Sequence, residues 1–329
     1  MLNLEEKFQS LLSEAAPEGS HLLASHLPDL PHHRLARDVQ GAPIIMIAVP
    51  HGRAQTRPVP IRLEHLSIQH DVECRITGID GEIEEGQFTV IACLGTDHAL
   101  HSYFLRVLEP IITLLGPSPT RSDITRAVYN LIELFRVMAA APLKSVQGLW
   151  AEVFLIAHAA DPTLLLAAWH TTPEDRYDFS SGDQRIEVKA TAGRIRRHRF
   201  SLEQLQPPTG TTALVASLFV ERAGSGTSLA ELIEKVRHQI GDNLDLLMAL
   251  DRIVGMTLGN SWRQAMDEQF DYELAIHSLA FFDVVDVPSI ESELPPEVSG
   301  VHFISDLSNI PLVDSAHHKI SGGIFSGIV

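Results

Sequence analysis

The chain has 329 residues, of which 45% are apolar and 20% charged, so it can bury a substantial core and does not have the composition of a disordered protein. Its 42 acidic residues outnumber 25 Lys and Arg, and the formal net charge of −17 excludes a protein that coats nucleic acid with a generally basic surface. Its two cysteines form no CxxC unit, so neither a disulfide scaffold nor a cysteine zinc site is expected.

The N-terminal segment 1–7 lacks the basic start and apolar run of a signal peptide. No stretch approaches the roughly 20 uninterrupted apolar residues that a membrane-spanning helix needs. We therefore expect a soluble, cytoplasmic protein.

The first 116 residues predict a β-rich domain of unknown role. A helix is expected over 3–15, and the His-, Pro- and Leu-rich segment 19–34 predicts a loop. Runs of β-branched residues bounded by Gly, Pro or Asp then predict strands over 44–49, 61–68, 72–76 and 88–94, with a hairpin turn at Asp80-Gly81.

A helix begins at His98, and Pro110 is expected to kink or split it. The run Gly116-Pro117-Ser118-Pro119 interrupts the chain, and we place a domain boundary there.

Residues 117–329 mix predicted helices with predicted strands. Helices are expected over 122–138, 146–159, 201–205 and 229–253, and strands over 176–180, 184–191, 212–221, 272–285 and 301–304. The expected fold class is therefore α+β or α/β, with a β-rich domain over 1–116 followed by an α/β domain over 117–329.

The predicted hairpin at 176–191 carries the strongest chemical signal. Gly182-Asp183 places glycine where a two-residue type II′ turn needs it, and that turn puts Asp178 directly opposite Glu187. Lys189 lies two residues beyond Glu187 and projects from the same face. The hairpin is expected to bring two carboxylates and an ammonium together.

Two carboxylates directly opposite one another repel, and a divalent cation between them would make the arrangement favourable. Mg²⁺ suits such a site because it takes oxygen ligands, usually one or two carboxylates, and Lys189 could orient or help to deprotonate a water. The alternative is an ordinary exposed hairpin with a Glu–Lys pair.

The region resembles the PD-(D/E)xK, or restriction-endonuclease-like, nuclease superfamily, in which an acid near one strand end is followed by (D/E)xK on the next strand. Asp178 and Glu187-Val188-Lys189 match that pattern. A preceding helix often supplies another acid in such families, and Glu152 in the apolar stretch 148–155 matches it. The alternative for Glu152 is a solvent-facing or capping acid.

The chain is more specifically similar to bacterial proteins called PD-(D/E)XK motif proteins, which are often associated with phage-defence gene clusters. The segments that carry this resemblance are 148–152, 177–179, 186–191 and 200–205, and together they cover about residues 144–205. The resemblance implies a restriction-endonuclease-like core with a mixed sheet, metal binding by Asp178, Glu187, Glu152 and the Val188 carbonyl, and catalysis that includes Lys189. Asp175, after Pro173-Glu174, is the reserve candidate for the first ligand.

A basic segment follows the hairpin. Between residues 185 and 199 six basic residues and one acid give a local balance of +5, which leaves −22 elsewhere. Guanidinium groups suit bidentate phosphate contacts. The expected substrate-binding residues are Arg194, Arg196, Arg197, Arg199 and, on the following short helix, Gln204. The alternative is a solvated loop whose arginines pair with acids of this acidic protein.

Together these features predict a nuclease that hydrolyses DNA phosphodiester bonds with Mg²⁺, or Mn²⁺ as a substitute, in a bacterial restriction or phage-defence system. No GxxxxGK[ST] phosphate loop occurs, so an ATPase or another defence protein would be a partner. The competing hypothesis is a catalytically inactive nuclease-fold subunit that binds DNA or protein within a defence complex.

Overall fold

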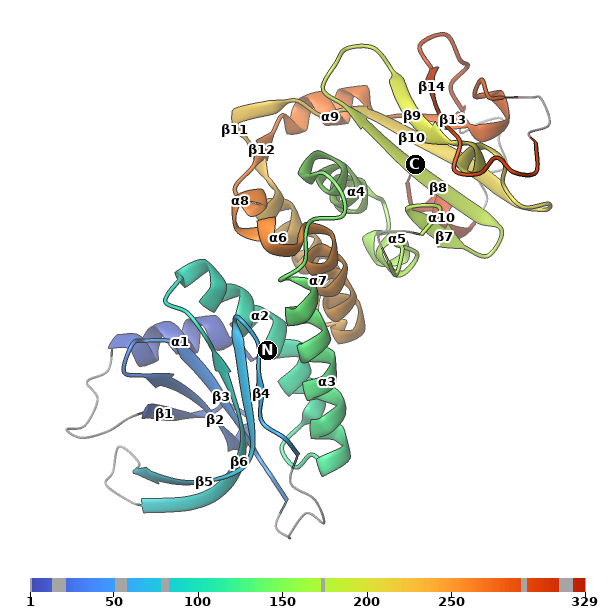
Figure 1. The fold of residues 1–329 in the computed structure, drawn as a ribbon. Coiled ribbons are helices and arrows are strands. Elements are labelled where there is room, and N and C mark those ends of the chain that lie inside the picture. The colour runs from blue at the N-terminus through green and yellow to red at the C-terminus, as the bar shows by residue number, and fades with distance from the viewer. Residues whose placement is uncertain are drawn as a thin grey trace. The chain divides into compact units, whose positions relative to one another are not determined.

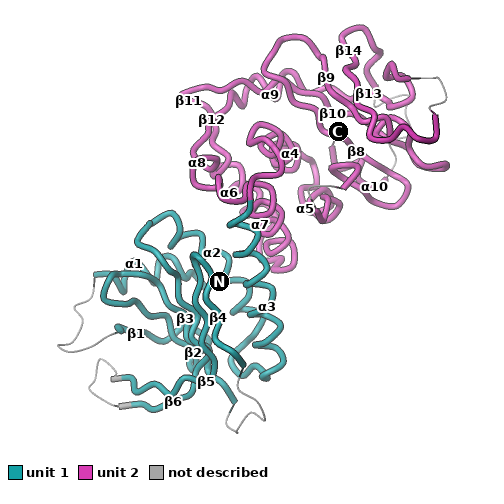
Figure 2. The backbone as a smooth tube through the Cα atoms, in the orientation of Figure 1, with its two compact units in different colours: residues 1–140 teal, residues 141–329 magenta. Residues whose placement is uncertain are grey.

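The computed structural model describes residues 2–13, 22–50, 58–77, 83–172, 175–290, 295–313 and 322–328. It divides into two compact units, residues 1–140 and residues 141–329 (Figure 2). The predicted boundary at 116–119 falls on the loop between two helices of the first unit, and the division of the chain at residue 117 stays a prediction. Among the described helices, none is long and apolar enough to cross a membrane.

The first unit contains a six-stranded antiparallel sheet with strand order β1-β2-β3-β6-β5-β4 (Figure 1). Its strands are β1 (Leu22–Leu27), β2 (Leu30–Asp38), β3 (Pro43–Ala48), β4 (Ile61–Arg62), β5 (Leu66–Thr77) and β6 (Ile83–Cys93). Its helices are α1 (Leu4–Ser13), α2 (His98–Leu115) and α3 (Arg121–Val137). The β-rich character expected of this half is therefore present.

The loop prediction for 19–34 was wrong, because β1 and β2 form a hairpin there. Its turn passes through Asp29, which adopts a positive φ of 61°, and the register shifts at His26/Leu27. The predicted Asp80-Gly81 turn lies outside the described residues, although the flanking Thr77 and Ile83 are paired across β5 and β6.

The second unit is built on a four-stranded mixed sheet with order β13-β10-β8-β7, which confirms the α+β class. The parallel pair β8 (Gln184–Thr191) and β10 (Thr212–Phe219) is flanked by antiparallel β7 (Phe179–Ser181) and β13 (Ala280–Asp283). Two small sheets pair β9 (Arg197–Ser201) with β14 (His302–Asp306), and β11 (Arg222–Ser228) with β12 (Gln269–Phe270).

Helix α4 (Val146–His158) packs against β8 and is buried from Leu149 to Ala157. The remaining helices are α5 (Pro162–Ala167), α6 (Leu229–Ile240), α7 (Leu244–Leu258), α8 (Trp262–Met266), α9 (Tyr272–Ser278) and α10 (Gly323–Ser326). Short 3-10 turns are η1 (Leu202–Leu205), η2 (Gly259–Ser261) and η3 (Val284–Asp286).

Several other expected elements differ from the structure. The strands predicted over 61–68 and 72–76 are the short β4 and one continuous β5. Helix α2 runs through Pro110 without a break, the long helix predicted over 229–253 is two helices separated at Gly241, and the strand predicted over 272–285 begins as helix α9. None of these corrections affects β7, β8 or α4, which carry the predicted site.

Candidate metal centre and its surroundings

The β7–β8 hairpin has the predicted register. Phe179 pairs with Ile186, and Gly182 in the turn has the positive φ, 52°, that a type II′ turn requires of its first central residue. The backbone ladder ends at Phe179, however, so Asp178 does not form the predicted strand pair with Glu187. Beyond the ladder, the backbone of β7 and of Asp178 is hydrogen-bonded to the preceding segment 168–170.

Asp178 is hydrogen-bonded both to the segment 168–170 and to β8. Its Oδ2 accepts a hydrogen bond of 2.8 Å from the backbone N–H of Val188, and its backbone carbonyl accepts one of 2.8 Å from the N–H of His170. Its Oδ1 accepts a hydrogen bond from Lys144 Nζ at 2.8 Å. The carboxylate is buried and has no freedom to turn away from the hairpin without losing these bonds.

Glu152 projects from α4 toward the same point. The helix begins directly after Ser145, whose side chain caps it, and Glu152 lies in its buried middle. Glu152 Oε1 accepts from Lys144 Nζ at 2.9 Å, and Oε2 accepts from Trp169 Nε1 at 2.8 Å and lies 2.8 Å from His170 Nε2. The alternative of a solvent-facing acid is therefore wrong.

Glu152, His170 and Asp178 form a compact group of potential ligands. One donor atom from each lies within 4.8 Å of the others, and all three side chains are buried. His170 Nδ1 has no hydrogen-bond partner among the described residues. Two carboxylates with an imidazole are a donor set that divalent cations accept, so these residues fit a metal ion. Glu187 lies outside this group of three.

Glu187 belongs to a second, adjoining group. Its Oε1 accepts hydrogen bonds from Lys189 Nζ at 2.7 Å and from Gln204 Nε2 at 2.6 Å, and Gln204 Oε1 accepts one from Lys189 at 3.2 Å. Gln204 is held by the capping box that it forms with Ser201 at the start of η1. Glu187 Oε2 is buried and, within the described chain, has no hydrogen-bond partner.

The two groups are electrostatically linked. Burial and the charge of Asp178 raise the pKa of Glu187 to about 8, although Lys189 opposes this. Burial and the charge of Glu152 raise the pKa of Asp178, against the effect of Lys144. At neutral pH, without a further cation, the site therefore tends to hold a proton on Glu187.

The pKa values of Glu152 and Lys144 are shifted by the groups that contact them. Burial would raise the pKa of Glu152, but the hydrogen bond with His170 and the charge of Lys144 hold it below its usual value. Burial would lower the pKa of Lys144, but the charges of Asp178 and Glu152 raise it above its usual value. Lys144 is thus an ammonium between two carboxylates.

The basic segment after the hairpin makes mostly intramolecular contacts. Arg194 pairs with Glu221, and Arg197 with Asp306. Arg196 turns inward and donates to the backbone carbonyl and Oγ of Ser217 and to the carbonyl of Ser278. Arg199 makes no ion pair with any described residue. This is the arrangement expected of the alternative, and the substrate-binding role of these arginines stays a prediction.

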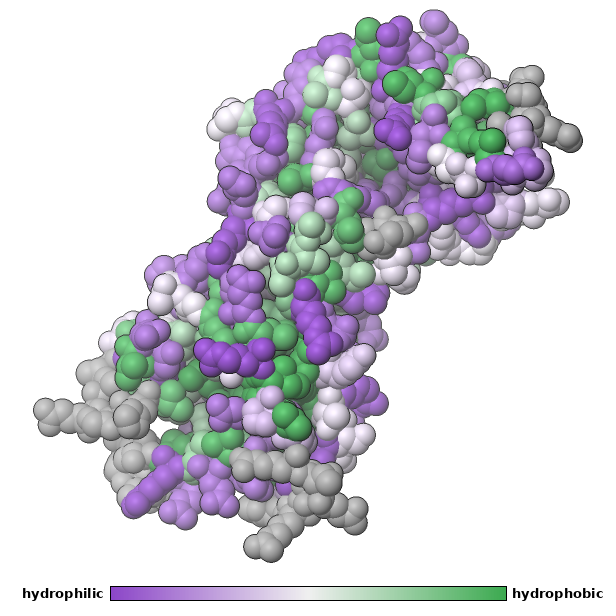
Figure 3. Space-filling view, viewed as in Figure 1, coloured by the Kyte–Doolittle hydropathy of each residue, from purple (hydrophilic) through white to green (hydrophobic). Residues whose placement is uncertain are grey.

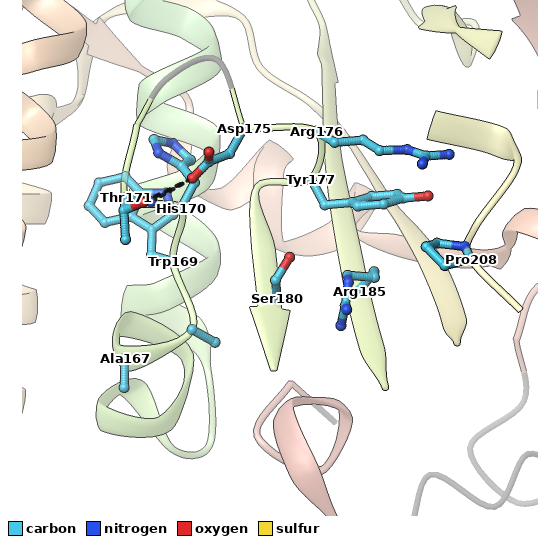
Figure 4. Close-up of a pocket in the computed structure, with 11 residues that line it drawn as sticks. Ala167, Trp169, His170, Thr171, Asp175, Arg176, Tyr177, Ser180, Arg185 and Pro208 are labelled. Carbon is cyan, nitrogen blue, oxygen red and sulfur yellow. Dashed lines mark hydrogen bonds between the residues drawn. The ribbon is translucent and has the colours of Figure 1, made fainter. Parts of the chain in front are cut away.

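A pocket of about 480 Å³ opens beside the hairpin (Figure 4). Trp169, His170 and Tyr177 line it together with two arginines, Arg176 and Arg185. The Arg176 side chain lies over the Tyr177 ring, 5.2 Å from its centroid, and also donates to the backbone carbonyl of residue 206. Arg185 donates only to the backbone carbonyls of residues 182 and 184, so neither guanidinium is neutralised by a described carboxylate.

Asp175, the reserve candidate for the first ligand, lies on the rim of this pocket. Its carboxylate accepts hydrogen bonds from the backbone N–H and the hydroxyl of Thr171 (Figure 4) and from the same groups of Thr172. These hydrogen bonds lower its pKa against the opposing effect of desolvation. It therefore closes a local turn and lies outside the Glu152 group. The neighbouring Pro173-Glu174 falls outside the described residues.

Sequence reasoning missed Lys144 and His170. Neither belongs to the (D/E)xK pattern, and each reaches the site only because α4 and the edge of β7 meet in space. The burial of α4 around Glu152 was the one available signal, because an acid within an apolar helix needs a cation or donor beside it.

The comparisons with known proteins agree with the predicted resemblance. A family model described as "Putative PD-(D/E)XK family member, (DUF4420)" matches residues 4–308. No curated protein and no solved structure matches the chain.

Proposed function

Because the chain belongs to the family described as "Putative PD-(D/E)XK family member, (DUF4420)", which indicates a nuclease-like fold, we propose that it is a divalent-metal-dependent nuclease that hydrolyses phosphodiester bonds of DNA. The observation that supports the proposal is the buried pair Glu152 and Asp178, which Lys144 bridges, beside the adjoining contact of Glu187 with Lys189.

Glu152, His170 and Asp178 would hold the cation, and Mg²⁺, with Mn²⁺ as a substitute, is the ion we propose. When bound, it would stabilise the negative charge that develops on the phosphoryl oxygens. The Val188 carbonyl and Glu187 are further ligand candidates from the sequence pattern. Glu187 Oε2 is the carboxylate oxygen available for this, because Oε1 is occupied by Lys189 and Gln204.

Lys189 would position the attacking water. Its ammonium is held between Glu187 Oε1 and Gln204 Oε1 and lies 5.1 Å from the ring centroid of Phe200, so its direction is fixed by three contacts. Glu187, with a pKa near 8, could take or release a proton close to neutral pH. Gln204 would then serve as a positioning residue, because it contacts both groups.

The test is DNA cleavage by the full chain with Mg²⁺ or Mn²⁺, with EDTA as the metal-free reference. Glu187→Gln and Lys189→Met are expected to lower the cleavage rate by roughly 10²–10⁴-fold, the usual range for loss of a positioned acid, base or metal ligand. Glu221→Gln, which changes a surface acid paired with Arg194, is the matched control and should cleave normally. Equal rates in all four proteins would contradict the proposal.

The second candidate is a nuclease-fold subunit without catalytic activity, which binds DNA or protein in a defence complex. The observation that favours it is the Lys144 ammonium, because that group neutralises Glu152 and Asp178 without a metal. Titration with Mn²⁺ discriminates between the two: the first candidate binds the ion and loses it in Asp178→Asn, and the second binds none. A bacterial restriction or phage-defence setting, with an ATPase partner, belongs to both proposals.

A further inference from the structure

Lys144 lies just before α4, and its ammonium reaches the middle of the candidate metal ligands. Lys144 Nζ is 2.9 Å from Glu152 Oε1, 2.8 Å from Asp178 Oδ1 and 3.5 Å from His170 Nε2. These are the three residues whose donor atoms lie within 4.8 Å of one another. Lys144 therefore contacts every member of the group.

An ammonium and a divalent cation cannot share this group at the same time. Both require the carboxylate oxygens of Glu152 and Asp178, and two cations about 3 Å apart in a buried site repel strongly. Without any cation, the two buried carboxylates would repel each other and remain poorly solvated. The group therefore needs a cation, and it has room for only one at a time.

The Lys144 side chain is able to leave the group, because it is partly exposed to solvent. Its side chain is 24% exposed, whereas those of Glu152 and Asp178 are 4% and 8% exposed. It precedes the N-cap residue Ser145, so it can move without breaking a backbone hydrogen bond of the helix. A four-carbon stem with a strongly hydrated head is suited to such a movement.

We propose that Lys144 is an exchangeable counter-cation, which holds Glu152 and Asp178 together in the metal-free protein and leaves the group when a divalent cation binds. This rests on the proposed metal site. Lys144 thereby sets the metal affinity. The apparent dissociation constant for the metal equals the intrinsic constant divided by the fraction of molecules in which Lys144 has left the group.

The experiment is calorimetric titration of Mn²⁺ into the full chain and into Lys144→Met, with thermal denaturation of both in EDTA. Lys235→Met is the matched control, because Lys235 contacts Tyr272 at the surface and its removal changes the net charge equally. If Lys144 occupies the group for about nine tenths of the time, Lys144→Met binds Mn²⁺ about tenfold more tightly. It also melts at a lower temperature in EDTA and regains stability with Mn²⁺.

A second measurement uses the unaltered chain and does not depend on the variant folding. Acetylation of lysines by acetic anhydride, followed by mass spectrometry, is expected to modify Lys144 faster when Mn²⁺ is present, while Lys235 is modified at an unchanged rate.

The outcomes separate this inference from the proposed function. Equal or weaker Mn²⁺ binding by Lys144→Met, or Lys144 acetylation that does not rise with Mn²⁺, overturns the counter-cation while the metal site stands. Failure of both the full chain and Lys144→Met to bind Mn²⁺ overturns the metal site and the counter-cation together.

Discussion

At the scale of single residues, Glu187 is the most unusual group of the site. Its pKa of about 8 in the folded chain compares with an ordinary value of 4.5. Between these two values the folded state retains a proton that the unfolded state has released, so this group stabilises the fold fully below about pH 4.5 and loses that contribution as the pH rises toward 8.

Glu187→Gln cannot titrate, and we expect it to remove this loss. In thermal denaturation without divalent ions, the variant should melt close to the full chain at pH 5 and a few degrees above it at pH 8. A difference between the two melting temperatures that does not grow with pH would show that Glu187 titrates normally.

Glu187, Lys189 and Asp178 were identified from the sequence because the (D/E)xK spacing places two groups on one face of a strand and a short turn brings a third opposite. Glu152 was identified only through the family resemblance. In the structure Lys189 contacts Glu187, and Lys144 bridges Asp178 and Glu152, whereas the chemical roles of these residues stay predictions. Lys144 could not be found in this way, because its contacts join positions 8 and 34 residues apart through tertiary packing alone.

At the scale of elements, the strand pair β11–β12 provides a sharp test of local packing. A Cβ added at Gly226 would lie 2.2 Å from the backbone carbonyl oxygen of Phe270, whereas one added at Gly224 would meet nothing within 4 Å. Both glycines lie in the same strand, so a general effect of losing glycine would act on both.

Gly226→Ala is therefore expected to lower the free energy of unfolding by about 1–3 kcal/mol or more, the usual range for forced overpacking. Gly224→Ala should change it by less than about 0.5 kcal/mol. Urea denaturation of the two variants measures this difference, and equal midpoints would contradict the close approach of β11 to β12.

The elements predicted incorrectly have two causes: at Pro110 packing outweighed a local signal, and at Gly241 and Asp271 a local capping signal outweighed the apolar periodicity on which the prediction rested. Pro110 should break a helix, but α2 is buried on both sides of it, at Leu108 and at Ile111. Gly241 ends α6 with a φ of 59°, and Asp271 caps α9 by accepting from the N–H of residue 274. These last two capping signals were present in the sequence, but the prediction gave more weight to apolar periodicity.

At the scale of the whole molecule, the net charge of −17 is unevenly distributed along the chain, with +5 over residues 185–199 and −22 elsewhere. The basic segment at 185–199 is largely paired internally, so its local balance of +5 overstates the positive charge available to a ligand. Hydrophilic residues predominate on the visible face of the second unit, and hydrophobic residues gather in the region of β13 and β14 (Figure 3). Val285 and Ile304 are among the exposed hydrophobic residues of the second unit.

Arg176 and Arg185 line the pocket, and neither forms an ion pair with a described carboxylate. We expect the double variant Arg176→Ala/Arg185→Ala to bind single-stranded oligonucleotides more weakly in EDTA. The slope of log affinity against log salt should become shallower by about 0.7 for each phosphate that the variant no longer neutralises.

Arg194→Ala is the matched control for that prediction, because it removes a guanidinium already paired with Glu221. Fluorescence anisotropy at several salt concentrations gives both the affinity and the slope. A larger loss of affinity in Arg194→Ala than in the double variant would contradict this prediction. It would indicate that the basic segment 185–199 binds the nucleic acid, as the sequence predicted.

We propose that Glu152, His170 and Asp178 hold a divalent cation, and anomalous diffraction from a crystal of the full chain soaked in Mn²⁺ is the decisive experiment. A single anomalous peak is expected among these three side chains, with the Lys144 ammonium moved away from both carboxylates. A Mn²⁺-soaked crystal with no peak there, and with Lys144 still bridging Glu152 and Asp178, would contradict it.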